Sequence, residues 1–148
     1  MKNWYLPFAA LLVVSSTSAQ QSVINWHFSS KRISENVYEV TFTATLEKGW
    51  HIYSGQLGDG PVPTKISFAP SPVLSLKGRV KEANNIKAER SSIFNSEIKY
   101  YENTLTLIQY VQVRGTSRTA IKGSIDFMVC DNQQCLPPKK IEFSILLA

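Results

Sequence analysis

Apolar and polar residues alternate along most of this chain, which is the pattern of half-buried β-strands. The clearest case is 36–46, NVYEVTFTATL, where the apolar side chains from Tyr38 to Leu46 share one face and Glu39 and three threonines share the other. No long segment has a helical period, so the predicted class is all-β. Further strands are predicted at 23–28, 50–54, 64–69, 104–113, 119–129 and 140–147.

Roughly seven short strands of this kind favour an immunoglobulin-like sandwich of two sheets, with a closed barrel as the alternative. Residues 47–49 should form a turn, after which 50–54 pairs back as the partner of 36–46. The segment 77–103 mixes charged and polar residues with isolated aromatics. We expect it to be irregular, as either a functional loop or a disordered stretch.

The start of the chain resembles a targeting signal. Lys2 precedes a short apolar run, and small residues lead up to Ala19. We therefore expect a secretory signal peptide at 1–19 and one domain at 20–148, with an uncleaved membrane anchor as the alternative. No second apolar run is long enough to cross a bilayer, so the mature chain is expected to have no membrane span.

The distribution of charged residues argues against nucleic acid as a partner. The formal net charge is +5, but the basic residues are scattered and form no long run interleaved with aromatics. Nucleic acid is therefore not an expected partner.

Cys130 and Cys135 are the only cysteines, with four residues between them. Cys130 ends one predicted strand and Cys135 lies shortly before the next, so the pair sits at a hairpin connection. Adjacent antiparallel backbones can bring two sulfurs within bonding range there. The residues leave a structural clip, a redox couple and a zinc site open.

The three possibilities differ in what they require. A ring this short stabilises by only about 2 kcal/mol in the chain-entropy model, whereas strained or exposed disulfides exchange with other thiols. Zinc needs four ligands, or three and a water, and only His27 and His51 could join the cysteines. The neighbouring Asp131 would raise a thiol pKa and so disfavours a strongly activated sulfur.

Three motifs occur together: TATLEKGWHIYS at 43–54, SSIFNSEIKYYENTLTL at 91–107 and VCDNQQCLPP at 129–138. In this order they resemble the N-terminal periplasmic domain of the transmembrane disulfide reductase DsbD, over nearly the whole mature chain. The resemblance implies an immunoglobulin-like periplasmic domain, with no metal or organic cofactor. Its cysteine pair would take electrons from a thioredoxin-like or DsbD-type protein and pass them to envelope oxidoreductases, as a monomer.

The resemblance also implies roles for individual residues. Cys135 matches the cysteine that forms the mixed disulfide with partners, and Cys130 its resolving mate. Phe94 matches a cap-loop aromatic that shields the pair from stray oxidants, Tyr53 matches an aromatic packed near the site, and His51 replaces a second tyrosine. Without the family resemblance, Phe94 can equally be an ordinary core or loop-anchoring aromatic, Tyr53 is better explained as a core aromatic of the sandwich, and His51 as a structural histidine.

The chain departs from the family pattern in three ways. Four residues separate the cysteines where the best-known members have five, and Ser92 and Ile93 replace an acidic pair before the cap phenylalanine. The chain ends at Ala148 without the membrane and thioredoxin-like domains, so another protein is expected to supply electrons. The rival interpretation is a non-catalytic immunoglobulin-like binding or assembly module with a structural disulfide.

Overall fold

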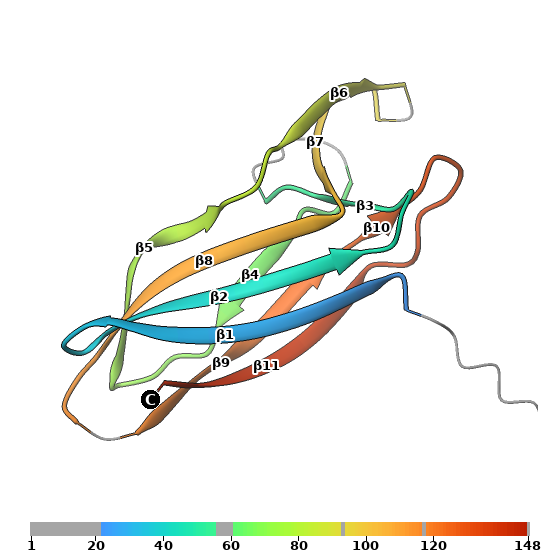
Figure 1. Cartoon of the computed structure of the whole chain (residues 1–148). Helices are drawn as coiled ribbons and strands as arrows, with labels where there is room; N and C mark the ends of the chain where they lie inside the picture. Colours follow the sequence, from blue (N-terminus) through green and yellow to red (C-terminus); the bar gives the residue numbers. More distant parts are fainter. Residues whose placement is uncertain (1–21, 56–60, 93, 117, 148) are drawn as a thin grey trace, which may run out of the picture.

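The computed structural model describes residues 22–55, 61–92, 94–116 and 118–147 (Figure 1). Within these ranges the chain forms eleven strands and no helix, which confirms the all-β prediction. It follows that these ranges hold no helix long and apolar enough to cross a membrane. The predicted signal peptide at 1–19 lies outside the described residues.

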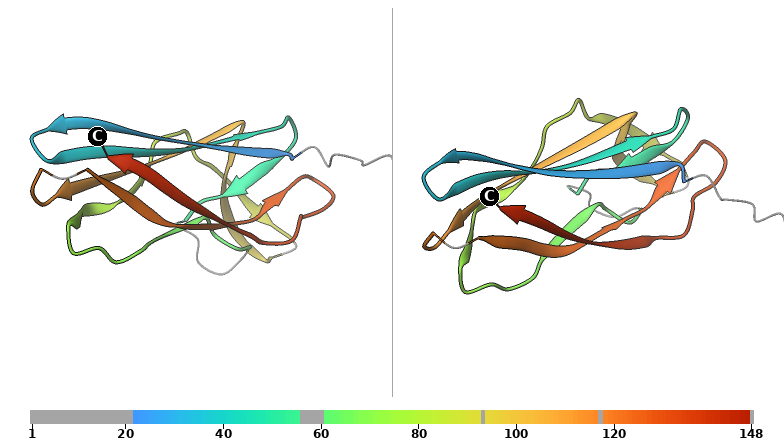
Figure 2. Two further views of the ribbon diagram at one scale, coloured as in Figure 1. Left: turned by 90° about the horizontal axis from the view of Figure 1, so that it is seen from below. Right: turned by 60° about the horizontal axis from the view of Figure 1, so that its bottom comes forward.

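Two of the sheets form a sandwich, as predicted. One is a four-stranded antiparallel sheet in the order β1-β2-β8-β5, made of Ile24–Ser34, Val37–Leu46, Thr104–Val113 and Leu74–Glu82. The other has three antiparallel strands in the order β11-β9-β4, made of Lys139–Leu147, Thr119–Phe127 and Lys65–Phe68. Figure 2 shows β1 and β2 in one layer and β9 and β11 in the other.

The sandwich core follows from the alternation in the sequence. In β2 the side chains of Val40, Phe42 and Ala44 are fully buried, whereas the threonines between them are not. Phe42 meets Phe143 of the other sheet edge-on, with the ring centroids 4.9 Å apart. Burial of such large apolar side chains is the main force that holds the two sheets together.

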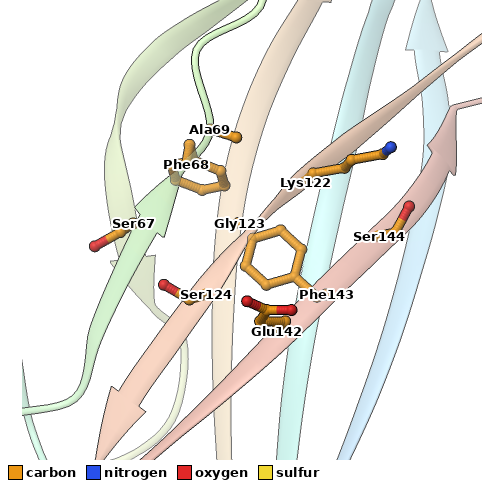
Figure 3. Close-up of a pocket in the computed structure, with 9 residues that line it drawn as sticks. All are labelled: Ser67, Phe68, Ala69, Lys122, Gly123, Ser124, Glu142, Phe143 and Ser144. Carbon is orange, nitrogen blue, oxygen red and sulfur yellow. The ribbon is translucent and has the colours of Figure 1, made fainter.

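Gly123 in β9 makes room for this packing. A Cβ atom there would lie 2.1 Å from the backbone oxygen of Ser67 and 2.8 Å from the ring of Phe143. A shallow surface hollow of about 650 Å³ lies here, lined by residues of β4, β9 and β11 that include Lys122 and Glu142 (Figure 3). None of the predicted site residues lines this hollow.

A third sheet, which the sequence did not predict, extends from one end of the sandwich (Figure 1). Its antiparallel strands run in the order β10-β3-β7-β6, made of Val129–Cys130, His51–Tyr53, Ser96–Glu102 and Lys87–Ser91. β7 leads into β8 through Asn103, which adopts a left-handed conformation (φ 64°) that asparagine tolerates well. β9 leads into β10 through Met128 alone. Two strands of the sandwich thus continue into the third sheet.

Two sequence predictions are wrong. The segment 77–103 is not irregular, because β6, β7 and most of β5 fall in it. Residues 50–54 do contain a strand, β3, but it pairs with β7 and β10 and not with β2. A turn at 47–50, closed by the Trp50 N–H donating to the Glu47 carbonyl at 3.1 Å, turns β3 away from β2.

Candidate functional site

Cys130 and Cys135 form a disulfide across the connection between β10 and β11, as their position on the predicted strand map allowed. Their Cα atoms are 4.0 Å apart and form an antiparallel bridge. On one side of the pair the Asp131 N–H donates to the Gln134 carbonyl at 2.9 Å, and on the other the Leu136 N–H donates to the Val129 carbonyl at 3.0 Å. The disulfide is therefore a rung of a small hairpin.

Asp131 holds the turn between the two cysteines. Its Oδ1 accepts the backbone N–H groups of Gln133 at 2.8 Å and Gln134 at 2.7 Å. These hydrogen bonds stabilise the charged carboxylate and lower the pKa of Asp131. The residue next to the cysteine thus has a structural function in the ring.

The two cysteines differ sharply in exposure. Cys130 is 1% exposed, whereas Cys135 and the residues after it up to Lys140 are exposed. Cys130 is buried because it lies in β10 and packs among apolar side chains of its own sheet. Cys135 is exposed because the chain has by then left the sheet. Of the two bonded residues, Cys135 therefore lies on the solvent-exposed side of the ring and Cys130 on the buried side.

The two faces of the third sheet pack against different hydrophobic clusters. Val129, Ile52 and Tyr101 are neighbours across three strands, and all three are buried in the main core. The adjacent row contains Cys130, His51 and Glu102, whose side chains point to the opposite face because side chains alternate along a strand. We call this second face the site face.

An apolar cluster covers the site face around the buried cysteine. We call it the site cluster; its buried members are Tyr53, Ile98, Met128 and Cys130. Phe94, Tyr100 and Val62 are partly buried and pack against it. The structure thus brings two predicted site residues, Tyr53 and Phe94, into the same cluster as Cys130.

Phe94 reaches this cluster from a hairpin tip. β6 and β7 form an antiparallel pair that ends at Ser91 opposite Ser96, and Phe94 lies in the turn between them. The Phe94 N–H donates to Ser91 Oγ at 3.3 Å, and Asn95 takes a positive φ of 50° to complete the turn. Ile93, which replaces one residue of the family's acidic pair, lies outside the described residues.

His51 and Tyr53 are joined on the site face. Nε2 of His51 is 3.0 Å from the hydroxyl of Tyr53, and the rings meet nearly at right angles. Burial lowers the pKa of His51, although the carboxylates of Glu102, Glu89 and Asp131 oppose that effect. Burial and the charge of Glu89 raise the pKa of Tyr53. Both side chains are therefore uncharged at neutral pH.

Some site residues could not be identified from the cysteine motif. Met128, Ile98 and Tyr100 pack around Cys130 but were not among the predicted site residues. The signal for two of them is present in the sequence, because alternation along 96–102 puts Ile98 and Tyr100 on one face. Their proximity to Cys130 depends on the pairing of β3 with both β7 and β10, which is not encoded locally.

Metal-binding side chains do not gather at this site or elsewhere in the described ranges, where no group of three or more His, Cys, Asp or Glu is placed to hold an ion. His27 lies on β1 opposite Thr43, and His51 lies on β3 opposite Cys130. The two histidines thus belong to different sheets.

Comparison with known proteins places the chain among thiol–disulfide exchange domains. The family described as the N-terminal part of the thiol:disulfide interchange protein DsbD matches residues 19–147. No significantly similar sequence was found among curated proteins.

Three solved structures share the fold. The reduced DsbD N-terminal domain of Neisseria meningitidis is 15% identical, with a TM-score of 0.53 over 80% of this chain and 82% of that one. The N-terminal periplasmic domain of ScsB from Proteus mirabilis is 15% identical, with a TM-score of 0.60 over 88% of this chain and 48% of that one. The Neisseria meningitidis complex of the DsbD and PilB N-terminal domains gives 12% identity and a TM-score of 0.54, over 82% of this chain and 80% of that one.

Proposed function

The chain belongs to the family of DsbD N-terminal domains, and from this premise we propose that it is a periplasmic carrier of electrons by thiol–disulfide exchange. Its redox couple is the Cys130–Cys135 disulfide. The electrons come from a thioredoxin-like or DsbD-type protein and pass to oxidoreductases of the cell envelope. The carrier uses no metal or organic cofactor.

The observation that carries this proposal is the unequal exposure of the two bonded residues. Cys135 is exposed on the connection before β11, and Cys130 is 1% exposed in the site cluster. A purely structural clip has no need of an accessible end, whereas exchange requires one sulfur that a partner can attack.

The chemistry is the same in both directions. Reduction of the oxidised carrier begins when a partner thiolate attacks Cys135 Sγ. A new disulfide then joins the partner to Cys135, and Cys130 leaves as a thiolate that takes up a proton. The partner's second thiol then attacks its own linked sulfur and releases Cys135. In total two electrons and two protons enter the carrier, and the partner becomes a disulfide.

Phe94 serves as the cap in this proposal. Reduced thiols in an oxidising compartment would lose electrons to small oxidants without purpose. Phe94 lies in a short turn at the tip of the β6–β7 hairpin and packs against the site cluster. A docking partner can displace such a tip without disturbing the sandwich, much as lids gate other sites.

The partner is expected to be a protein with its own cysteine pair. One structural neighbour is a complex between the DsbD and PilB N-terminal domains of Neisseria meningitidis. We propose by analogy that the exposed Cys135 is presented to a thioredoxin-like domain in the same kind of protein–protein contact.

Trapping of the mixed disulfide tests the proposal. The Cys130→Ala variant, mixed with a thioredoxin-like protein that lacks its second cysteine and whose remaining cysteine carries thionitrobenzoate, should accumulate a covalent complex through Cys135, detected on non-reducing gels and located by mass spectrometry. The variant with both cysteines changed to Ala is the control and should trap nothing. A complex formed only by Cys135→Ala would reverse the two roles, and no complex with either single variant would contradict the carrier function.

The reduction potential separates this function from its rival, a binding or assembly module with a structural clip. Structural disulfides of secreted proteins have potentials below about −300 mV. Equilibration of the Cys130–Cys135 pair with glutathione buffers should give a higher value for a carrier. A potential below that limit would favour the clip.

A further inference from the structure

His51 and Cys130 are directly opposite one another where β3 pairs with β10. Both side chains lie on the site face, and residues opposed in an antiparallel pair have Cβ atoms about 4.5–5.5 Å apart. An imidazole at that separation can exchange a proton with a thiol directly or through one water. Cys130 is also 1% exposed, so bulk water is poorly placed to do so.

From this pairing we propose that His51 accepts and returns the proton of the Cys130 sulfur during exchange. The inference rests on the proposed carrier function, and it names the residue that handles the proton at the buried end of the couple. Burial of a thiol in apolar surroundings raises its pKa and makes the thiolate scarce. A neighbouring base removes that obstacle.

The carboxylates around His51 are largely occupied by other groups. Glu102, opposite it on β7, is paired with Lys87 of β6 at 2.6 Å. Asp131, after β10, accepts the backbone N–H groups of its own turn. Glu89 of β6 accepts the Tyr100 hydroxyl at 3.3 Å. Each of these groups has another partner, which leaves His51 as the base nearest to Cys130 along the pairing of β3 with β10.

The tyrosines on this face cannot replace His51. Burial is the first cause of the raised pKa of both Tyr53 and Tyr100, so their hydroxyls stay protonated well above neutral pH. The Tyr53 oxygen lies 3.0 Å from Nε2 of His51. If it accepts Nε2–H, it fixes the tautomer in which Nδ1 is free to take up a proton. Histidine is also the side chain whose charge changes between about pH 5 and 8.

The proton balance is simple. With Cys135 linked to a partner, neutral His51 takes the proton from the Cys130 thiol as Cys130 Sγ attacks Cys135 Sγ. The Cys130–Cys135 bond forms, the Cys135–partner bond breaks, and the partner leaves as a thiolate. The imidazolium of His51 then loses its proton to the solvent. In the reverse direction protonated His51 gives its proton to Cys130 as that sulfur departs.

Ring closure can be measured on the purified, reduced protein with dithionitrobenzoate. The exposed Cys135 reacts first and releases one coloured thiolate, and attack by Cys130 then releases a second one. The rate of the second phase isolates the Cys130 step, and the Cys130→Ala variant should lack that phase. In the wild type the second-phase rate should fall at acidic pH as His51 becomes protonated, with an inflection below the ordinary histidine pKa of about 6.5 because burial lowers the pKa of His51.

The variants separate proton transfer from packing. His51→Gln should slow the second phase at neutral pH by about a hundredfold or more and lose the inflection below pH 6.5. His51→Tyr keeps an aromatic ring at the position, and its second phase should be as slow as that of His51→Gln. His27→Gln changes the other histidine, on β1, and should behave like the wild type.

Each outcome decides between the two proposals. An unchanged second phase in His51→Gln, or a wild-type profile without the inflection, overturns the role of His51 and leaves the carrier function intact. The wild-type profile needs no substitution, so it remains decisive if a variant fails to fold. Complete absence of the second phase in the wild type would instead contradict the carrier function itself.

Discussion

The Glu82 carboxylate accepts the hydroxyl of Tyr101 at 2.6 Å and thereby ties β5 of the sandwich to β7 of the third sheet. The same carboxylate accepts Ser54 Oγ at 2.7 and 3.0 Å and the Gly55 N–H at 2.8 Å. Ser54 follows directly after β3, the strand that carries His51. One carboxylate thus fixes two strands of the sheet that holds the candidate site.

Removing this carboxylate should destabilise the fold. We expect Glu82→Ala to lower the free energy of unfolding by about 2 kcal/mol or more, because the buried Tyr101 hydroxyl loses its acceptor. Glu82→Gln keeps one carbonyl acceptor, so its free energy of unfolding should fall clearly less. Urea unfolding measures the free energy of both variants. Equal losses in the two variants would mean that charge, and not hydrogen bonding, is what matters at this position.

The hydrogen bond between Glu82 and Tyr101 should also affect the stability of the fold at alkaline pH. Burial, the hydrogen bond to Glu82 and its negative charge all raise the pKa of Tyr101. A folded-state pKa above the unfolded value of about 10 gives a stabilisation that is complete below pH 10. It is lost as the pH rises further, because the unfolded chain then releases protons first.

Tyr101→Phe removes this titration and should therefore make the fall in unfolding free energy above pH 10 less steep. Denaturant curves taken on both sides of pH 10 measure the slope. Tyr38→Phe is the control, because Tyr38 lies on β2 of the sandwich, away from the third sheet. An unchanged slope in Tyr101→Phe would show that its raised pKa contributes nothing to this loss.

Loss of the cap side chain should affect protection and not the fold. We predict that Phe94→Ala remains folded and that its reduced cysteines react several-fold faster with dithionitrobenzoate, because the ring no longer packs against the site cluster. Phe94→Leu keeps an apolar side chain, so its reaction rate with dithionitrobenzoate should lie between those of Phe94→Ala and the wild type. Exchange with a protein partner should change less, because the partner displaces the tip. Equal reagent rates in all three proteins would rule out a cap at Phe94.

The disulfide should stabilise the fold only modestly. Replacing Cys130 by Ala and Cys135 by Ser together should lower the free energy of unfolding by about 2 kcal/mol, since the closed ring is short. Ala suits the buried position because a serine hydroxyl there would be costly to bury. Reduction of the wild type with dithiothreitol removes the same bond without substitution and should give a similar loss. Failure of the double variant to fold would indicate a structural staple.

Most of the sandwich could be read from the sequence. β8 has the predicted bounds, and β2 and β11 differ from the prediction by one residue at the start, because each alternates between a buried and an exposed face. β6 could not be found in this way. All but one of its five residues are exposed, so burial imposes no alternation on it.

The candidate site was predictable in part. The cysteine spacing and the strands around it showed that a hairpin disulfide was geometrically possible, with a zinc site still open, and the motifs indicated Tyr53 and Phe94. The pairing of His51 with Cys130 was not predictable, because it joins residues far apart in the chain through the register of β3 and β10. The turn that sends β3 into the third sheet depends on long-range contacts as well as on its own residues.

The separation of the site cluster from the main core has a consequence for local stability. Ile98 and Met128 belong to the site cluster, whereas Ile52 and Val129 on the other face belong to the main core. A fluctuation that lifts β6 and the tip of the β6–β7 hairpin breaks the small cluster and leaves Tyr101 and the sandwich in place. Amide protons of β6 should therefore exchange with solvent through a partial opening, at a lower free energy than those of β2 and β8, which require global unfolding.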